Sequence, residues 1–340
     1  MGVSIIVPVH EGQDKHSLRT CLESLLRLQP RPVEILLVSD GRFVTLPDTV
    51  DTSRITPLST GTPSGPAVAR NLGAVQASGD ILLFIDSDIQ VPEDLVAGVQ
   101  RKFEEHPEAA ALFGSYDAAP SQSNFLSQYR NLLHHYVHQT GQEAAFTFWS
   151  GCGAIRRSVF QEIGGFDGLK YAKPSIEDIE LGYRLRKAGY SIRLCKDVQV
   201  KHLKRWEADS MLRADFFYRA MPWTHLLLEE RELANDLNLK QSDRLSVALV
   251  FLIILSAGLA VWVPLFAALF IGSLLFFLLL NKQLYRFFYR ARGGYFALRA
   301  VPWHLVFYGL SGLAFAAGLS AHYWRRLSGG LLRAYRAKAG

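Results

Sequence analysis

Two aspartates, Asp86 and Asp88, directly follow a short apolar run, Ile81–Ile85. An uninterrupted apolar run of this length is typical of a buried β-strand. Two carboxylates at the end of such a strand need a partner, and a hard divalent cation is the usual one. Asp and Ser are also common turn residues, so a simple turn is the alternative interpretation. The position directly after an apolar strand favours a cation site.

A second acidic pair, Glu177 and Asp178, opens a stretch with helical spacing of apolar residues that ends at Gly189. We expect both carboxylates at a helix N-terminus, where the dipole lowers the pKa of an acid and keeps it ionised. Adjacent helical residues point in different directions, so the two should not share one role. The alternative interpretation is that they only cap the helix.

The framework for these residues begins with Val3–Val9 and Val33–Val38, two predicted buried strands with an amphipathic helix between them that starts at Asp14. Asp40 follows the second strand, just as Asp86 and Asp88 follow the strand Ile81–Ile85. In an open α/β sheet, ligands bind outside the carboxyl ends of the strands. The G-x-G-x-x-G fingerprint of dinucleotide-binding folds is absent after the first strand.

Further strands and helices alternate as far as Trp206, which predicts an α/β fold. The sequence predicts strands over 53–58, 109–116 and 191–200 and helices over 67–77, 92–105 and 123–139. The last of these helices carries His134, His135 and His138. No acidic or cysteine partner lies nearby in the sequence, so a solvated helix face is favoured over a metal site.

Residues Val3 to Trp206 resemble the family 2 glycosyltransferases, which are inverting enzymes of the GT-A fold. Short motifs carry the resemblance in the expected order: Ile6-Val7-Pro8-Val9, Ser39-Asp40-Gly41, Ala69-Arg70-Asn71 with Gly73, Asp86-Ser87-Asp88, Gly164-Gly165-Phe166-Asp167 and Glu177-Asp178. Each motif alone is weak, whereas the ordered set is specific. The resemblance implies a mixed, mostly parallel sheet that binds a nucleoside diphospho-sugar.

The sequence departs from the family pattern at two places. His10 stands where many members have Asn. Residues 201–206, Lys-His-Leu-Lys-Arg-Trp, lack the Gln of the Gln-x-x-Arg-Trp motif found in processive polysaccharide synthases. A processive polymerase is therefore disfavoured.

The resemblance also implies roles for individual residues. Asp178 would be the catalytic base that accepts the proton of the acceptor hydroxyl, and Glu177 would orient the site. Asp88 would hold Mg²⁺ or Mn²⁺, with Asp86 towards the ribose or the metal and His202 as a further ligand. Asp40 would accept a hydrogen bond from a ring N–H of uracil or guanine, which cytosine lacks. The other substrate-binding residues implied are Pro8, Glu11, Arg70, Gly151, Arg205 and Trp206.

The segment 202–205 carries His202, Lys204 and Arg205, which would close over the donor diphosphate. For Lys204, a basic stripe against a membrane surface is an equal alternative. The net charge is +6, and the basic residues gather after Lys201 around apolar segments, which favours an anionic membrane surface over nucleic acid. The 3 cysteines are widely spaced, which predicts neither disulfides nor a zinc site and fits a reduced cytosolic setting. We expect residues 1–7 to form a strand rather than a signal peptide.

The C-terminal third is dominated by Leu245–Leu280, which carries no charge over 36 residues. About 20 apolar residues cross a bilayer, so the Val263-Pro264 pair predicts a hairpin of two short spans. We therefore expect a catalytic domain over 1–208, amphipathic interfacial helices over 209–244, membrane segments over 245–263, 264–280 and 297–320, and a basic tail over 321–340.

The topology of these segments stays open. With a cytoplasmic catalytic domain, three spans place the basic tail outside, against the positive-inside rule. Either the third segment is re-entrant, or 245–280 forms one long tilted element.

These observations predict a membrane-anchored inverting glycosyltransferase of the cell membrane, which moves a sugar from a UDP- or GDP-sugar to a lipid-linked acceptor hydroxyl at the cytoplasmic face. One alternative is a polyprenyl-phosphate glycosyltransferase, which attaches the sugar directly to a phosphate. A non-catalytic nucleotide-sugar-binding membrane protein is disfavoured, because a scaffold does not need a base. A transporter would require more spans with polar residues at the midplane. The sugar and the acceptor stay open.

Overall fold

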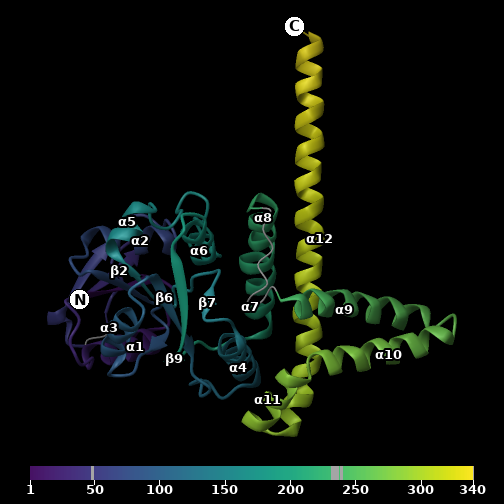
Figure 1. Ribbon diagram of the computed structural model, residues 1–340, viewed down its shortest axis with the longest axis horizontal. Coiled ribbons are helices and arrows are strands. Elements are labelled where there is room, and N and C mark those ends of the chain that lie inside the picture. The colour runs from purple at the N-terminus through teal and green to yellow at the C-terminus, as the bar shows by residue number, and fades with distance from the viewer. Residues whose placement is uncertain (47–49, 231–236, 238–239, 340) are drawn as a thin grey trace. The chain divides into compact units, whose positions relative to one another are not determined.

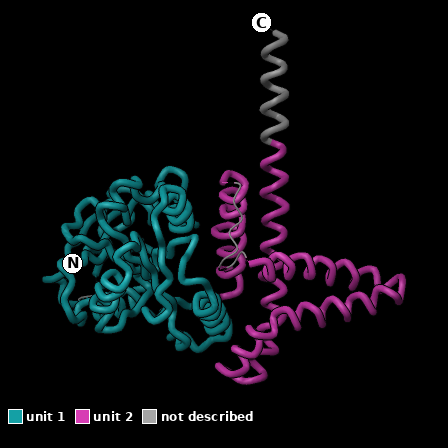
Figure 2. The backbone as a smooth tube through the Cα atoms, viewed as in Figure 1, with its two compact units in different colours: residues 1–206 teal, residues 207–340 magenta. Residues whose placement is uncertain are grey.

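The computed structural model describes residues 1–46, 50–230, 237 and 240–339, with the side chains of the last helix as far as Trp324. The chain divides into two compact units, residues 1–206 and 207–340 (Figure 2). Residues 47–49 and parts of the predicted segments 209–244 and 321–340 lie outside the described residues.

A mixed sheet forms the centre of unit 1 (Figure 1). Its strand order is β3-β2-β1-β4-β8-β6-β9-β5, with β7 beside β9. The described strands are β1 (Val3–His10), β2 (Glu34–Asp40), β3 (Ile55–Ser59), β4 (Ile81–Ile85), β5 (Ile89–Gln90), β6 (Ala109–Tyr116), β7 (Ala144–Ala145), β8 (Cys152–Arg156) and β9 (Ser191–His202). Strands β1 to β4 are parallel, β8 runs antiparallel between β4 and β6, and β9 is parallel to β6. The predicted α/β class with a mixed, mostly parallel sheet is confirmed.

Helices cover both faces of this sheet. They are α1 (Lys15–Leu26), α2 (Pro66–Gln76), α3 (Leu95–Glu105), α4 (Phe125–Thr140), α5 (Arg157–Glu162) and α6 (Glu177–Lys187). On one face, α1 and α3 bury their apolar residues with Ile5 and Val7 of β1. On the other, α2 approaches so closely that a Cβ on Gly73 would lie 2.6 Å from Ile6 Cγ2. Because both faces are covered, the central strands are apolar throughout, which is why they were predictable.

Strand β8 was not predicted as a strand. The sequence analysis singled out 146–155 only for its glycines, because a glycine inside a strand weakens the strand pattern. The structure explains the glycine: a Cβ on Gly153 would lie 2.3 Å from the carbonyl oxygen of Trp149. The chain folds back on itself here, and β8 pairs with the strand that ends at the aspartates.

Unit 2 is helical. It contains α7 (Ala208–Arg213), the π-helix η2 (Ala214–Ala220), α8 (Met221–Glu230), α9 (Gln241–Leu259), α10 (Leu265–Leu280), α11 (Lys282–Arg292) and α12 (Gly294–Ala339). Leu249 and Ile253 of α9, Phe277 of α10 and Tyr308 of α12 pack in one apolar cluster. The chain reverses between α9 and α10, so the alternative of one long tilted element over 245–280 is wrong.

Within the described residues, two helices are long and apolar enough to cross a bilayer, Gln241–Leu259 and Gly294–Trp324. Helices α10 and α11 meet this criterion only together and are bent by 66° relative to each other. The predicted basic tail lies in α12, and its side chains from residue 325 onward are outside the described residues.

Candidate active site

The carboxyl ends of β1, β2 and β4 carry acidic residues at one edge of the sheet. Asp40 is the last residue of β2 and lies opposite His10 at the end of β1. Its Oδ1 accepts hydrogen bonds from the backbone N–H groups of Ser64 (2.6 Å) and Gly65 (3.0 Å). Asp40 therefore fixes the loop that leads into α2.

Arg70 links the end of β4 to the start of α6. Its Nη2 lies 2.7 Å from Asp86 Oδ1, and its Nη1 lies 2.8 Å from Glu177 Oε1. The side chains of Arg70 and Glu177 are each 6% exposed. Burial opposes the charged form, but Asp86 and Glu177 outweigh it and raise the pKa of Arg70 above its usual value. A permanently charged guanidinium thus holds two carboxylates that are far apart in the sequence.

Asp178 faces a different partner from its neighbour Glu177, as expected for adjacent helical residues. Its Oδ2 accepts hydrogen bonds from the backbone N–H (3.0 Å) and Oγ (3.1 Å) of Ser150. One turn along α6, Gly182 lets the helix lie directly on the preceding segment, since a Cβ there would be 2.5 Å from Phe148 N. This close packing brings Asp178 to Ser150.

The expectation that the helix dipole lowers the pKa of Asp178 is wrong. Burial and the charge of Glu177 raise the pKa of Asp178 to about 6, despite the hydrogen bond from Ser150 N–H and the charge of Arg70. The sequence placed the residue at a helix N-terminus but did not reveal how far the fold desolvates it. The residue as a whole is nevertheless only partly buried.

Asp88 is brought to His202 by the short strand β5. Ile89 pairs with His202 across the β5–β9 ladder, and Leu203 N–H donates to Asp88 O at 2.8 Å. His202 Nε2 then lies 3.7 Å from Asp88 Oδ2. Burial alone would raise the pKa of Asp88, but His202 and Lys204 outweigh it and hold that pKa below its usual value. Asp88 is therefore a charged carboxylate beside an imidazole nitrogen.

The side chains of Asp88 and His202 fit a divalent cation whose other ligands would be substrate phosphates and water. Among the described residues, no group of three or more His, Cys, Asp and Glu side chains could hold a metal ion. An oxygen and a nitrogen 3.7 Å apart can both reach one ion at about 2.1 Å. Mg²⁺ sites commonly combine one or two carboxylates with substrate phosphates and water, and an imidazole nitrogen suits a transition-metal ion. Asp86 is less available as a ligand, because its Oδ1 is bound by Arg70.

The segment after β9 is anchored by the start of α4. The side chain of Gln122 donates to Leu203 O, that of Asn124 donates to Trp206 O, and Trp206 N–H donates to Ser127 Oγ. Trp206 is buried, whereas Lys204 and Arg205 are exposed. The Lys204 ammonium lies 4.4 Å from the centre of the Trp206 ring. The two exposed cations thus sit on a fixed backbone next to Asp88.

The remaining predicted residues lie along the same edge. Pro8 is buried in β1 and Glu11 is exposed in the turn that follows. Gly151 O accepts a hydrogen bond from Asp86 N–H at 3.1 Å, and a Cβ on Gly151 would lie 2.5 Å from the Trp149 ring. The sequence analysis missed Ser150, although it singled out the surrounding glycine-containing stretch.

The prediction of a solvated histidine face on α4 is wrong. His138 is buried, its Nδ1 lies 3.1 Å from Gly114 O, and burial lowers its pKa to about 4. Ring centres of His134 and His138 lie 4.9 Å and 5.5 Å from that of Trp149. These histidines belong to an aromatic cluster beside the acidic residues, which helical periodicity alone did not reveal.

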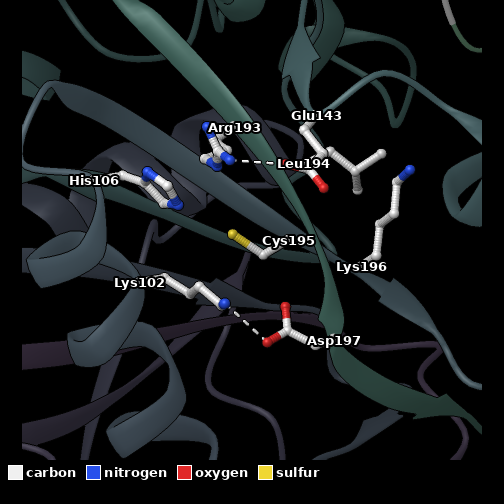
Figure 3. Close-up of a pocket in the computed structure, with 8 residues that line it drawn as sticks. All are labelled: Lys102, His106, Glu143, Arg193, Leu194, Cys195, Lys196 and Asp197. Atoms are coloured by element: carbon white, nitrogen blue, oxygen red, sulfur yellow. Dashed lines mark hydrogen bonds and ion pairs between the residues drawn. The ribbon is translucent and has the colours of Figure 1, made fainter.

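A separate pocket of about 270 Å³ opens between α3 and β9 (Figure 3). Its charged side chains are largely paired with one another, Lys102 with Asp197 and Arg193 with Glu143. None of the predicted site residues lines it. The candidate active site is therefore the acidic edge and not this pocket.

Comparison with known proteins agrees with the geometry. Residues 4–164 match the family model "Glycosyl transferase family 2". The O-antigen biosynthesis protein RfbC of Myxococcus xanthus is 31% identical over 261 residues, which cover 65% of this chain and 19% of that protein. Glycosyltransferase GlyG of Streptococcus pneumoniae is 26% identical over 146 residues, covering 42% of this chain and 44% of GlyG. The chain thus spans less than half the length of these relatives.

Among solved structures, GalNAc-T7 with UDP, GalNAc and Mn²⁺ aligns with a TM-score of 0.47 and 17% identity. The alignment covers 61% of this chain and 44% of that one.

Replacing Arg70 by Met should destabilise the protein strongly. The change leaves Glu177 buried without its cation, and breaking a buried ion pair typically costs about 3–5 kcal/mol. Arg19→Met is the matched control, because the Arg19–Glu23 pair is exposed and worth at most about 1 kcal/mol. Denaturant unfolding of both variants measures the difference. Equal losses of stability would show that the Arg70 bridge is not a structural anchor.

Proposed function

This chain belongs to glycosyl transferase family 2 through residues 4–164, and we propose that it transfers a sugar from a nucleoside diphosphate donor to an acceptor hydroxyl with inversion. The observation that carries the proposal is the carboxylate of Asp178, held by Ser150 next to the Arg70 bridge to the strand-end aspartate Asp86. A single displacement at the anomeric carbon requires a base on the acceptor side and positive charge on the side of the leaving diphosphate.

Asp178 accepts the proton of the acceptor hydroxyl while the hydroxyl oxygen attacks the anomeric carbon of the donor sugar. Ser150 orients the carboxylate, and a pKa of about 6 leaves it mostly ionised at neutral pH yet basic enough to accept a proton. Glu177 takes no proton in this scheme, because it is paired with Arg70. Its part is to hold the start of α6 in place.

The leaving diphosphate lies on the side of Asp88 and His202. A divalent cation, Mg²⁺ or Mn²⁺, held by these two residues would neutralise the charge that builds on the leaving oxygen. Lys204 and Arg205 add positive charge from a backbone that the start of α4 holds fixed. Such preorganised charges favour departure of the diphosphate.

The nucleoside would occupy the edge formed by Pro8, Glu11 and Asp40, with Gly151 and Trp206 bordering the sugar and diphosphate. The Ser64 and Gly65 amides orient the Asp40 carboxylate, which supports its role as acceptor for a ring N–H of the base. A UDP- or GDP-sugar meets that requirement.

The acceptor is proposed to be lipid-linked, with residues 1–208 on the cytoplasmic side of the cell membrane. The apolar helices α9 and α12 support anchoring, and an anchored enzyme keeps its site near lipid-borne substrates. In this scheme 209–244 lies at the interface, 245–263, 264–280 and 297–320 enter the membrane as a multi-pass anchor, and 321–340 is a basic tail. A hydroxyl acceptor is preferred over a lipid phosphate, because an ionised phosphate needs no base and Asp178 would then have no task.

Asp178→Asn should lower turnover by about 10²–10⁴-fold, which is the usual contribution of general-base catalysis. The amide keeps the size of the side chain and can still meet Ser150, but it cannot accept a proton. Donor binding should change little, because the base faces the acceptor. Turnover and donor affinity should be measured beside Glu177→Gln, which should reduce turnover less. Near-normal turnover of Asp178→Asn would remove the base assignment.

The pH profile of transfer should show an acid limb near pH 6. The reaction needs ionised Asp178, whose pKa is raised to about 6, so activity is complete above that value and falls as the pH drops through it. The measurement is kcat/KM against pH under saturating Mn²⁺. A profile that stays flat down to pH 4.5 would contradict an essential base with this pKa.

The full-length protein should resist extraction by high salt or carbonate, because apolar rather than ionic contacts hold it in the bilayer. A variant that ends at Lys240 lacks α9 to α12 and should leave the membrane fraction more readily. Fractionation followed by immunoblotting measures both. Release of the full-length chain by salt alone would rule out an integral anchor.

A further inference from the structure

We propose that Tyr116 is a positioning residue for His202 and thereby for the divalent cation. The inference rests on the proposed function, in which Asp88 and His202 hold that cation. It gives a function to the aromatic cluster of Tyr116, His134, His138 and Trp149, which takes no part in the steps of the proposed reaction.

The β6–β9 register places Tyr116 beside His202. Tyr116, the last residue of β6, lies opposite Val200, and His202 follows two residues later on the same face of β9. The register is shifted between Phe113 and Ser115, where a Cβ on Gly114 would lie 2.3 Å from Val198 O. The local sequence thus builds an irregularity that brings the tyrosine ring to the end of β9.

The rings of Tyr116 and His202 are stacked, with centres 4.3 Å apart and planes 16° from parallel. Tyr116 is itself held from other directions. Its ring centre lies 4.9 Å from that of Trp149 in an edge contact and 4.5 Å from that of His134. Its backbone carbonyl lies 2.7 Å from His135 Nδ1. The tyrosine is therefore a fixed surface against which the imidazole rests.

This stacking decides which way the imidazole faces. Rotation of a histidine ring about its last torsion is soft, so the ring plane must be set by its neighbours. In metal sites, a hydrogen bond from the second ring nitrogen usually does this. Within the described residues no hydrogen bond holds His202 Nδ1, so the stacked Tyr116 ring is the contact that orients the imidazole plane. With the plane so fixed, Nε2 points towards Asp88 Oδ2 at 3.7 Å.

If Tyr116 had only a structural role, its truncation would have different consequences. A buried ring that only fills space would, when truncated, cost stability and leave the affinity for the cation unchanged. A positioning ring should cost cation affinity, and a replacement that keeps the ring should recover it. An aromatic contact of this kind corresponds to an affinity change of about three- to tenfold.

The experiment titrates EDTA-stripped protein in detergent with Mn²⁺, first alone and then with UDP or GDP present, because the proposed site shares its cation with a diphosphate. Free Mn²⁺ is followed by electron paramagnetic resonance against a protein-free blank of the same composition. Tyr116→Leu should weaken Mn²⁺ binding about three- to tenfold, and Tyr116→Phe should restore it because the ring remains. His202→Ala marks the loss of the ligand itself. Phe103→Leu is the matched control, since it truncates a buried ring in the same domain that packs under Arg156 rather than against His202.

Each outcome separates the two claims. If the parent binds Mn²⁺ and His202→Ala weakens it, but Tyr116→Leu binds normally, the positioning role is wrong and the proposed metal site stands. If the parent binds no Mn²⁺ with or without the nucleotide, or His202→Ala binds as well as the parent, both the metal site and the inference are overturned. Should Tyr116→Leu fail to fold, Tyr116→Met preserves bulk without a ring and must show the same loss.

Discussion

The rest of the site depends on the two ion pairs that the buried guanidinium of Arg70 makes with Asp86 and Glu177. A charge that far from water is tolerated only with well-placed counter-charges, and Asp86 and Glu177 supply them at 2.7 Å and 2.8 Å. These carboxylates come from the end of β4 and the start of α6. One cation therefore joins the strand that carries the Asp-x-Asp pair to the helix that carries Asp178. The position of the proposed base follows from this bridge and from Ser150, not from the helix alone.

The fold gives Asp178 and Asp88 opposite electrostatic environments. Burial and the neighbouring Glu177 raise the pKa of Asp178 to about 6, whereas His202 and Lys204 outweigh burial at Asp88 and lower its pKa. A pair of acids tuned apart in this way can divide the work between accepting a proton and binding a cation. The backbone links the two sides, because Gly151 O, next to Ser150, accepts the N–H of Asp86.

Much of the framework was predictable because the central strands are covered on both faces. The runs Ile81–Ile85 and Ala109–Tyr116 were predicted with the boundaries that the structure has. Features that depend on contacts between distant segments were not predicted. Strand β8 was hidden by Gly153, whose missing side chain makes room for Trp149 O. The elevated pKa of Asp178 and the burial of His138 depend on desolvation by other segments, which local periodicity does not encode.

The most direct test of single-displacement transfer is the anomeric configuration of the first product, measured by proton NMR with an α-linked UDP- or GDP-sugar and a lipid-linked acceptor. Attack by a hydroxyl that Asp178 deprotonates, on the face opposite the diphosphate, predicts a β-linked product. An α-linked product would contradict the account, because retention requires a different arrangement of groups around the anomeric carbon than the one proposed for Asp178, Asp88 and His202.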